Sequence, residues 1–290
     1  METLPLADAL DIRRLVFRWA TPLIYAQWRC AFEDGRPEEA LDILACYQNG
    51  DGGFGHALEA NCWNPDSSPY VTGLAIQILG GLYGAEYSAV RRDHPVFRGI
   101  LAYLGSGAHA TEAGWLGMAL PGNNRHSHAP WFHHDPSAPP GETDPGPLVD
   151  FILRHGNEGD ALWRKALAIR ERLPARKPAP DLSRFDPSQF ICWEPMPSDI
   201  VDSPASPLYP EYKDLVDAQM DGIVRRLRET KELPVPGVDT FPAFPEPPPW
   251  LDNRQVISCY AATCGFFCMQ MRLLKKFGRL GFALPLKDSP

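Results

Sequence analysis

The sequence predicts an all-α fold in which helical hairpins close into an α/α toroid with long proline-rich loops, as one domain over residues 1–290. Three observations support this prediction. Apolar residues recur at helical spacing, no segment alternates convincingly in the manner of a strand, and amphipathic segments alternate with segments that are apolar on every side. Outer amphipathic helices that cover inner buried ones form a ring of hairpins, whereas a plain bundle would have shorter loops.

Helical periodicity and capping residues place the individual helices. Thr21, Ser68 and Asp160 are good N-caps, and prolines suit the first helical position after them or after a loop. The helix after Ser68 is apolar on all sides and is therefore expected to be buried. The predicted helices cover residues 7–19, 22–32, 37–48, 69–82, 95–104, 147–155, 161–173, 185–194, 212–228 and 253–276.

Prolines separate these helices into blocks. Of the 31 prolines, seven fall in residues 121–147, nine in residues 174–210 and seven in residues 234–249. Proline is unfavourable inside helices, so these windows are predicted to be loops. Aromatic residues occur among the prolines and need burial, so we expect the loops to pack as ordered structure. Long loops inside a domain usually carry function.

Charge and cysteine content limit the possible partners and compartments. The net charge is −8 and the pI is about 5.5, which disfavours nucleic acid or an anionic membrane as partner. Seven cysteines without paired spacing indicate a reducing, cytoplasmic setting. The N-terminus has no signal-peptide pattern, and no run of about 18 apolar residues predicts a membrane span. The oligomeric state stays open.

A glycine-rich turn links the predicted helices 37–48 and 69–82. Its sequence is QNGDGGFG, in which glycines allow positive φ and Asp51 is expected to bond backbone N–H groups. Gln48 and Phe54 resemble the Gln…Gly-x-aromatic repeat of the prenyltransferase and squalene/hopene cyclase superfamily. The resemblance implies an α/α toroid in which the glutamine ties helix ends together and the aromatic ring packs beside it. These turn residues are therefore expected to be scaffold.

The loop after the turn carries polar and aromatic side chains that a purely structural turn does not require. In the toroids that this stretch resembles, the same end of the inner helices opens into the active-site cavity. We expect His56 and Glu59 to be acid/base catalysts there, with burial raising the pKa of Glu59. Asn61 and Trp63 are expected to bind substrate. The alternative is a capped helix start with a surface histidine.

Residues 121–134, with the sequence PGNNRHSHAPWFHH, form a second unusual stretch. Similar NN…HAPW stretches follow DGGFGHxLE in bacterial proteins related to the cyclase repeats. We expect this stretch to enter the same cavity as residues 56–63 and to supply His128 as a third catalytic residue. The alternative is that His128 only bonds a backbone carbonyl and that the tryptophans are core. The further predicted substrate-binding residues are Asn123, Asn124, His126, Trp131 and Trp250.

No group of residues has the spacing of a metal site. The D-x-D-D signature of the protonating cyclases is absent. Cys62, His56 and the His126-x-His128 pair do not form a recognisable zinc set of the kind that the protein prenyltransferases use. Few basic residues surround the turn, which disfavours a prenyl diphosphate. We therefore expect no metal and no cofactor, and acid/base chemistry on a small-molecule substrate.

Three functions remain open. The first, which we predict, is a terpene-cyclase-like enzyme that cyclises or isomerises a hydrophobic, isoprenoid-like molecule. The second is a carbohydrate-active hydrolase or lyase, with Glu59 facing Glu194 or Asp202. The third is a non-catalytic binding protein with a degenerate cyclase fold. An apolar, aromatic cavity would favour the first, a polar cleft the second, and a filled centre the third.

Overall fold

The chain folds into helices that group into two units, which are described separately. Among the described residues no strand occurs, only isolated bridges, so the prediction of an all-α fold is confirmed. The computed structural model describes residues 1–83, 94–138, 141–173, 181–183, 185–186, 196–201, 203–229 and 253–286. Unit 1 comprises residues 1–35, 176–235 and 260–290, and unit 2 comprises residues 36–175 and 236–259.

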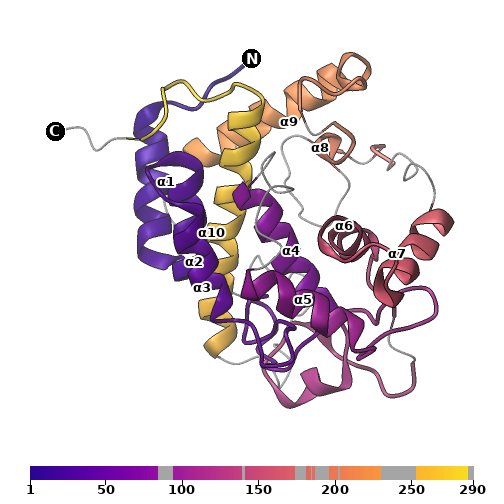
Figure 1. The fold of residues 1–290 in the computed structure, drawn as a ribbon. Helices are drawn as coiled ribbons and strands as arrows, with labels where there is room; N and C mark the ends of the chain where they lie inside the picture. Colours follow the sequence, from indigo (N-terminus) through magenta and orange to yellow (C-terminus); the bar gives the residue numbers. More distant parts are fainter. Residues whose placement is uncertain are drawn as a thin grey trace. The chain divides into compact units, whose positions relative to one another are not determined.

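Unit 1 is built from the first two helices and from helices after residue 196 (Figure 1). Its apolar core collects buried side chains from α1, α2, α9 and α10, and α9 packs on α1 and α8. The helices that contribute to unit 1 are α1 (Leu6–Trp19), α2 (Pro22–Phe32), α8 (Pro197–Ile200), α9 (Tyr209–Glu229) and α10 (Asn253–Lys276).

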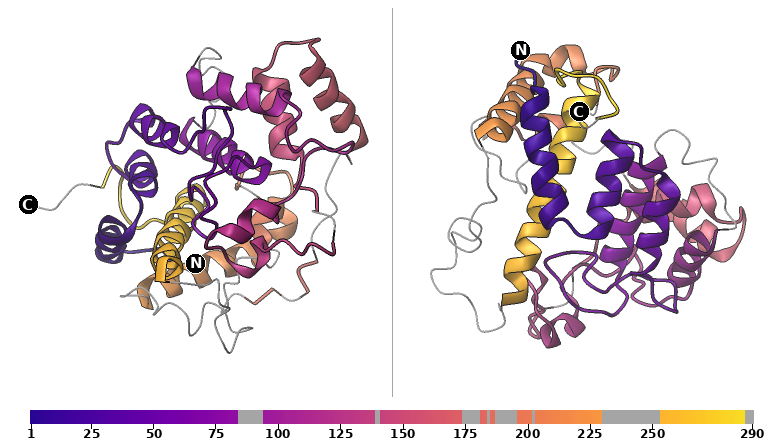
Figure 2. Two further views of the ribbon diagram at one scale, coloured as in Figure 1. Left: turned by 90° about the horizontal axis from the view of Figure 1, so that it is seen from below. Right: turned by 90° about the vertical axis from the view of Figure 1, so that its left-hand side faces the viewer.

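The N-terminal and C-terminal segments of unit 1 are joined to each other (Figure 2). Leu4 N donates to Arg279 O at 2.9 Å, and Gly281 N donates to Leu4 O at 2.9 Å. The Arg279 side chain is 4% exposed and donates to the carboxylates of Asp217 at 2.7 Å and Asp221 at 2.8 Å. Both carboxylates are on α9, so Arg279 fastens the joined segments to that helix.

Unit 2 holds the helix that was expected to be buried. α4 packs against α3 and α6, and α7 packs against α5 and α6. Buried residues cover more than one face of α4, but Gln77 and Gly81 are exposed, so the helix is buried on part of its circumference and not on all sides. The elements are α3 (Pro37–Ala45), α4 (Pro69–Tyr83), α5 (Pro95–Gly105), the 3₁₀ turns η2 (Pro121–Arg125) and η3 (Pro130–Phe132), α6 (Gly146–His155) and α7 (Ala161–Arg172).

The predicted caps begin three of the helices. Thr21 Oγ1 accepts from Ile24 N, Ser68 Oγ accepts from Val71 N, and Asp160 Oδ1 accepts from Trp163 N; these bonds satisfy amides that have no partner inside the helix. α9 begins three residues before the predicted start. Most of the predicted helix 185–194 lies outside the described residues, and α8 was not predicted.

The glycine-rich turn has the structural roles that the sequence predicted. Gln48 Nε2 donates to Gly52 O at 2.9 Å and to Val96 O, in the first turn of α5, at 3.0 Å. Asp51 Oδ1 accepts from Gly53 N at 2.9 Å. Phe54 is fully buried. The turn therefore ties the end of α3 to the start of α5.

Candidate functional site

The two stretches that the sequence predicted to converge are paired along their backbones. Trp63 N donates to Ser127 O at 2.9 Å, and Ala129 N donates to Asn61 O at 2.8 Å. These bonds flank an antiparallel bridge between Cys62 and His128. Side chains of such a non-hydrogen-bonded pair lie on the same face of the ladder. The two stretches therefore lie side by side, whereas the cavity that they were expected to share stays a prediction.

Glu59 lies half-buried beside this ladder. Its Oε1 accepts from Asn61 N at 3.1 Å and from Asn61 Nδ2 at 3.0 Å. Burial nevertheless raises the pKa of Glu59, as predicted, because loss of water outweighs the two hydrogen bonds. Burial, with a smaller contribution from Glu59, raises the pKa of Cys62 to about 11 and that of Tyr70 to about 12. The Cys62 thiol is therefore protonated at neutral pH.

Glu59→Gln tests the raised pKa, because glutamine keeps the accepting oxygen and removes the charge. A raised pKa means that the folded protein holds the proton more tightly than the unfolded chain does, so ionisation destabilises the fold as the pH rises above the ordinary value of 4.5. Glu59→Gln should be more stable than wild type at pH 7.5 and approach it at pH 4. Thermal unfolding at both pH values checks this, with the exposed Glu142→Gln as control. A less stable Glu59→Gln at pH 7.5 would contradict it.

His128 is fully buried and both of its ring nitrogens have partners. Nδ1 lies 2.6 Å from His126 O and therefore donates to it, and Nε2 accepts from His133 Nδ1 at 3.0 Å. The two rings are stacked with centroids 5.3 Å apart. Burial lowers the pKa of His128. These contacts fit the alternative of a backbone-bonded histidine.

The two predicted binding asparagines hold the loop that contains them. Asn123 is buried; its Nδ2 donates to Met118 O at 2.8 Å and to Phe132 O at 2.9 Å. Asn124 Nδ2 donates to His134 O, and Asn124 Oδ1 accepts from His134 N. Both amides therefore satisfy backbone groups of residues 118–134.

The other predicted site residues lie around this ladder or outside the described part. His56 is exposed and its Nε2 donates to Asn49 Oδ1 at 2.8 Å. Trp63 is half-buried and its Nε1 donates to Ala60 O at 3.2 Å. His126 is half-buried and Trp131 is 42% exposed. Trp250, Glu194 and Asp202 lie outside the described residues.

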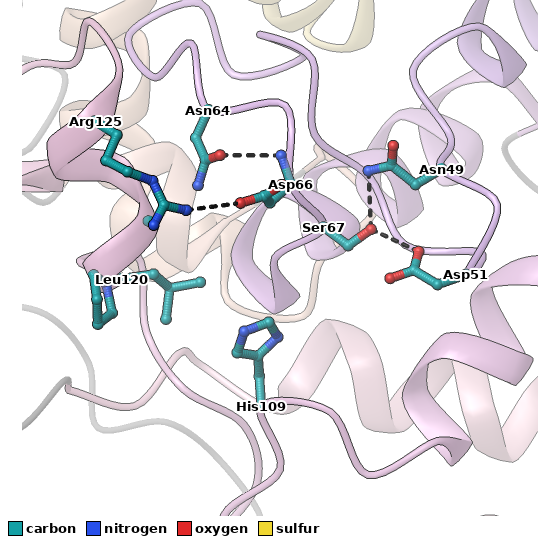
Figure 3. Close-up of a pocket in the computed structure, with 10 residues that line it drawn as sticks. Asn49, Asp51, Asn64, Asp66, Ser67, His109, Leu120 and Arg125 are labelled. Carbon is teal, nitrogen blue, oxygen red and sulfur yellow. Dashed lines mark hydrogen bonds and ion pairs between the residues drawn. The ribbon is translucent and has the colours of Figure 1, made fainter.

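A pocket of about 540 Å³ lies next to the paired loops, and seven of the ten residues that line it are polar or charged (Figure 3). None of the predicted site residues lines it. Two of the predicted site residues bind residues of the lining. His56 donates to Asn49, and Asn123 Oδ1 accepts from Asn64 Nδ2 at 3.0 Å. The lining residues are Asn49, Asp51, Asn64, Asp66, Ser67, His109, Leu120, Pro121, Gly122 and Arg125.

One side of the pocket is fixed by the glycine-rich turn. Asp51 Oδ1 accepts from Ser67 Oγ at 2.7 Å, in addition to the bond from Gly53 N. Asn49 Nδ2 donates to Ser67 Oγ at 3.0 Å and to Pro65 O at 2.9 Å. The turn that the sequence assigned to scaffold thus also presents a carboxylate and an amide to the pocket.

Asp66, Arg125 and His109 complete the polar part of the lining. Asp66 Oδ2 and Arg125 Nη2 are 3.7 Å apart, and both side chains are more than 60% exposed. The His109 ring points toward Asp66 and Ser67. Burial lowers the pKa of His109, and the charges of Asp51 and Asp66 offset only part of this effect. The imidazole is therefore neutral at pH 7.

Sequence reasoning missed this combination because its parts are far apart in the chain. Asp66 stands in a turn-forming NPDSS segment and His109 is an isolated histidine in a glycine-rich segment. His109 could have been recognised as a candidate, because it is a histidine in a segment whose glycines favour a tight turn. Its φ is 57°, in the left-handed region that non-glycine residues seldom adopt.

Within the described part of the chain, no three or more His, Cys, Asp or Glu side chains are grouped in a way that could hold a metal ion. No helix there is long and apolar enough to cross a bilayer. Comparisons with protein-family models, curated proteins and solved structures find no match. The resemblance to the cyclase repeats therefore rests on the residues of the turn.

Proposed function

We propose that unit 2 binds a hydroxyl-bearing small molecule of the sugar or polyol class in the pocket at Asp51, Asp66 and His109, and that the protein is a carbohydrate-active hydrolase or lyase. The observation that carries this proposal is the lining itself: two carboxylates, two amides, a hydroxyl, an imidazole and a guanidinium surround one cavity. Such groups pair with hydroxyls, whereas an isoprenoid calls for apolar and aromatic walls.

The net charge of the pocket lining limits the charge of the ligand. Two carboxylates and one guanidinium give the lining a net charge of −1 while His109 is neutral. This charge disfavours phosphorylated or diphosphate ligands and suits a neutral polyol. The overall charge of −8 likewise supports a small molecule over nucleic acid as partner. Cysteines without paired spacing support a cytoplasmic location as part of the proposal.

The proposed roles follow from how firmly each group is held. Asp51 Oδ1 is occupied by Ser67 and Gly53, which leaves Oδ2 to accept from a ligand hydroxyl. Asp66 makes a long ion pair with Arg125 and is largely exposed, so its carboxylate can also accept from a ligand hydroxyl. His109 contributes a neutral imidazole on the opposite wall.

A second candidate is the terpene-cyclase-like enzyme on an α/α toroid. Glu59 favours it, because a carboxyl group with a raised pKa beside Cys62 and Tyr70 is the kind of acid that protonates an apolar substrate. The tie between Gln48, Gly52 and Val96 supports the toroid as scaffold. The pocket at Asp66 has no part in this alternative.

Asp66→Asn separates the two candidates. Under the proposed function it removes an accepting charge from the pocket and should weaken binding of the responsive sugar by at least about tenfold. Isothermal titration with a panel of mono- and oligosaccharides measures this. The matched control is Asp150→Asn, which removes another exposed carboxylate paired with an arginine, away from the pocket. Binding of an isoprenoid alcohol that depends on Glu59 and not on Asp66 would instead support the second candidate.

A further inference from the structure

Tyr103 supports the pocket from behind His109. It lies on α5, is 1% exposed, and its Oη is 3.1 Å from His109 Nδ1. Burial, reinforced by the nearby charge of Asp51, raises the pKa of the Tyr103 phenol, so that it keeps its proton. In the described structure the Oη has no other hydrogen-bond partner.

Only one direction of the hydrogen bond between Tyr103 and His109 leaves no buried hydrogen without an acceptor. If Nδ1–H donated to Oη, the phenol proton would lie buried without an acceptor, which is unfavourable. If the phenol donates to Nδ1, every hydrogen has an acceptor. A neutral imidazole that accepts at Nδ1 carries its hydrogen on Nε2.

We propose that Tyr103 is a positioning residue that fixes the Nε2–H tautomer of His109, which makes His109 a hydrogen-bond donor to the ligand. The assignment of the donor to a ligand rests on the proposed function; the tautomer does not. His109 then supplies a donor on the wall opposite the acceptors Asp51 and Asp66 (Figure 3). The pocket would recognise a ligand that presents an acceptor oxygen beside hydroxyl donors, as a sugar ring does.

The backbone around His109 is built to hold this ring. Its φ of 57° is unfavourable for a residue with a side chain. A tight hairpin imposes it: Leu116 N donates to His109 O at 2.9 Å, and Thr111 N donates to Gly114 O at 2.9 Å. Strain that surrounding bonds maintain is characteristic of sites where a side chain must be aimed.

Nitrogen-15 NMR of the histidine-labelled protein at pH 7.5 tests the tautomer directly. His109→Gln identifies the signals. Wild type should show an unprotonated Nδ1 and a protonated Nε2. Tyr103→Phe removes the donor and should shift both His109 nitrogens toward a mixture of tautomers, whereas the control Tyr70→Phe, in the Glu59 neighbourhood, should leave them unchanged.

The outcomes separate this inference from the proposed function. A wild-type His109 protonated on Nδ1, or a folded Tyr103→Phe with unchanged His109 signals, overturns the inference. The wild-type spectrum decides the tautomer even if Tyr103→Phe does not fold. If the tautomer is as expected and no sugar binds, the positioning by Tyr103 stands and the proposed function fails. If a sugar binds, Tyr103→Phe should lower the affinity for that sugar several-fold.

Discussion

Gly52→Ala is expected to lower the free energy of unfolding by about 3–5 kcal/mol, the range of severe single substitutions. Gly52 has a φ of 90°, which residues with a side chain rarely adopt. A Cβ there would lie 2.0 Å from Gly99 O, on the backbone of α5. Backbone cannot move aside as a flexible side chain can. The change would also disturb the carbonyl of Gly52 that accepts from Gln48.

Urea unfolding followed by circular dichroism measures this effect. The matched control is Gly50→Ala, in the same turn, where an added Cβ meets nothing within 4 Å. The control should stay within about 0.5 kcal/mol of wild type. Equal stabilities for Gly52→Ala and Gly50→Ala would show that the turn is not packed against α5 in the way described.

Arg279→Met is the second large change, with an expected loss of about 3–5 kcal/mol in the free energy of unfolding. The substitution keeps much of the side-chain volume but leaves Asp217 and Asp221 without their shared cation. Both carboxylates are mostly buried, with side chains 17% and 23% exposed. Lys213 still pairs with Asp217 and the backbone amide of Glu2 still donates to Asp221, but neither replaces the buried guanidinium that compensates both carboxylates for their lost water.

Arg14→Met is the matched control for Arg279→Met. Arg14 pairs with Asp11 at 2.6 Å, but the two side chains are 63% and 41% exposed. Exposed pairs contribute about 0–1 kcal/mol, so the control should change stability by no more than that. A control as destabilised as Arg279→Met would contradict the argument from burial.

The pH dependence of the stability of Arg279→Met is a second test of the ion pair between Arg279 and Asp217. Burial acts to raise the pKa of Asp217, but hydrogen bonds and charges from Lys213 and Arg279 outweigh it and lower the pKa below 3.8. A lowered carboxyl pKa contributes stability above the ordinary value that is lost as the pH falls through the folded value. Wild type should therefore lose stability as the pH falls below about 4, and Arg279→Met less so.

The helices could be predicted well because their signals are local. Ser68 caps α4 through the amide three residues later, and Pro69 begins the helix, so both signals lie within one turn of sequence. α8 is four residues long and too short to show periodicity. The closure of the helices into a toroid stays a prediction, because it depends on contacts that no local pattern encodes.

The candidate site could be predicted only in part, for a related reason. The proximity of residues 56–63 to residues 121–134 was expected from their unusual composition, but the backbone pairing that brings them together was not. Composition did not tell which amides face a ligand: Asn123 and Asn49 have the same chemistry, yet Asn123 bonds backbone carbonyls behind the pocket and Asn49 lines it. His109 reaches the pocket through a hairpin and an unusual φ, which the sequence around it does not reveal.

The fastening of Leu4 to residues 279–281 has a consequence for the order in which the chain folds. During synthesis on the ribosome, the helices α3 to α7 of unit 2 emerge as one continuous piece, so their mutual contacts can form early. α1 and α2 emerge before unit 2, yet their partners on α10, and Arg279, which joins Glu2 to α9, are made only after the helices of unit 2. The apolar faces of α1 and α2 must therefore stay uncovered while unit 2 is made, which exposes them to chaperones on the nascent chain.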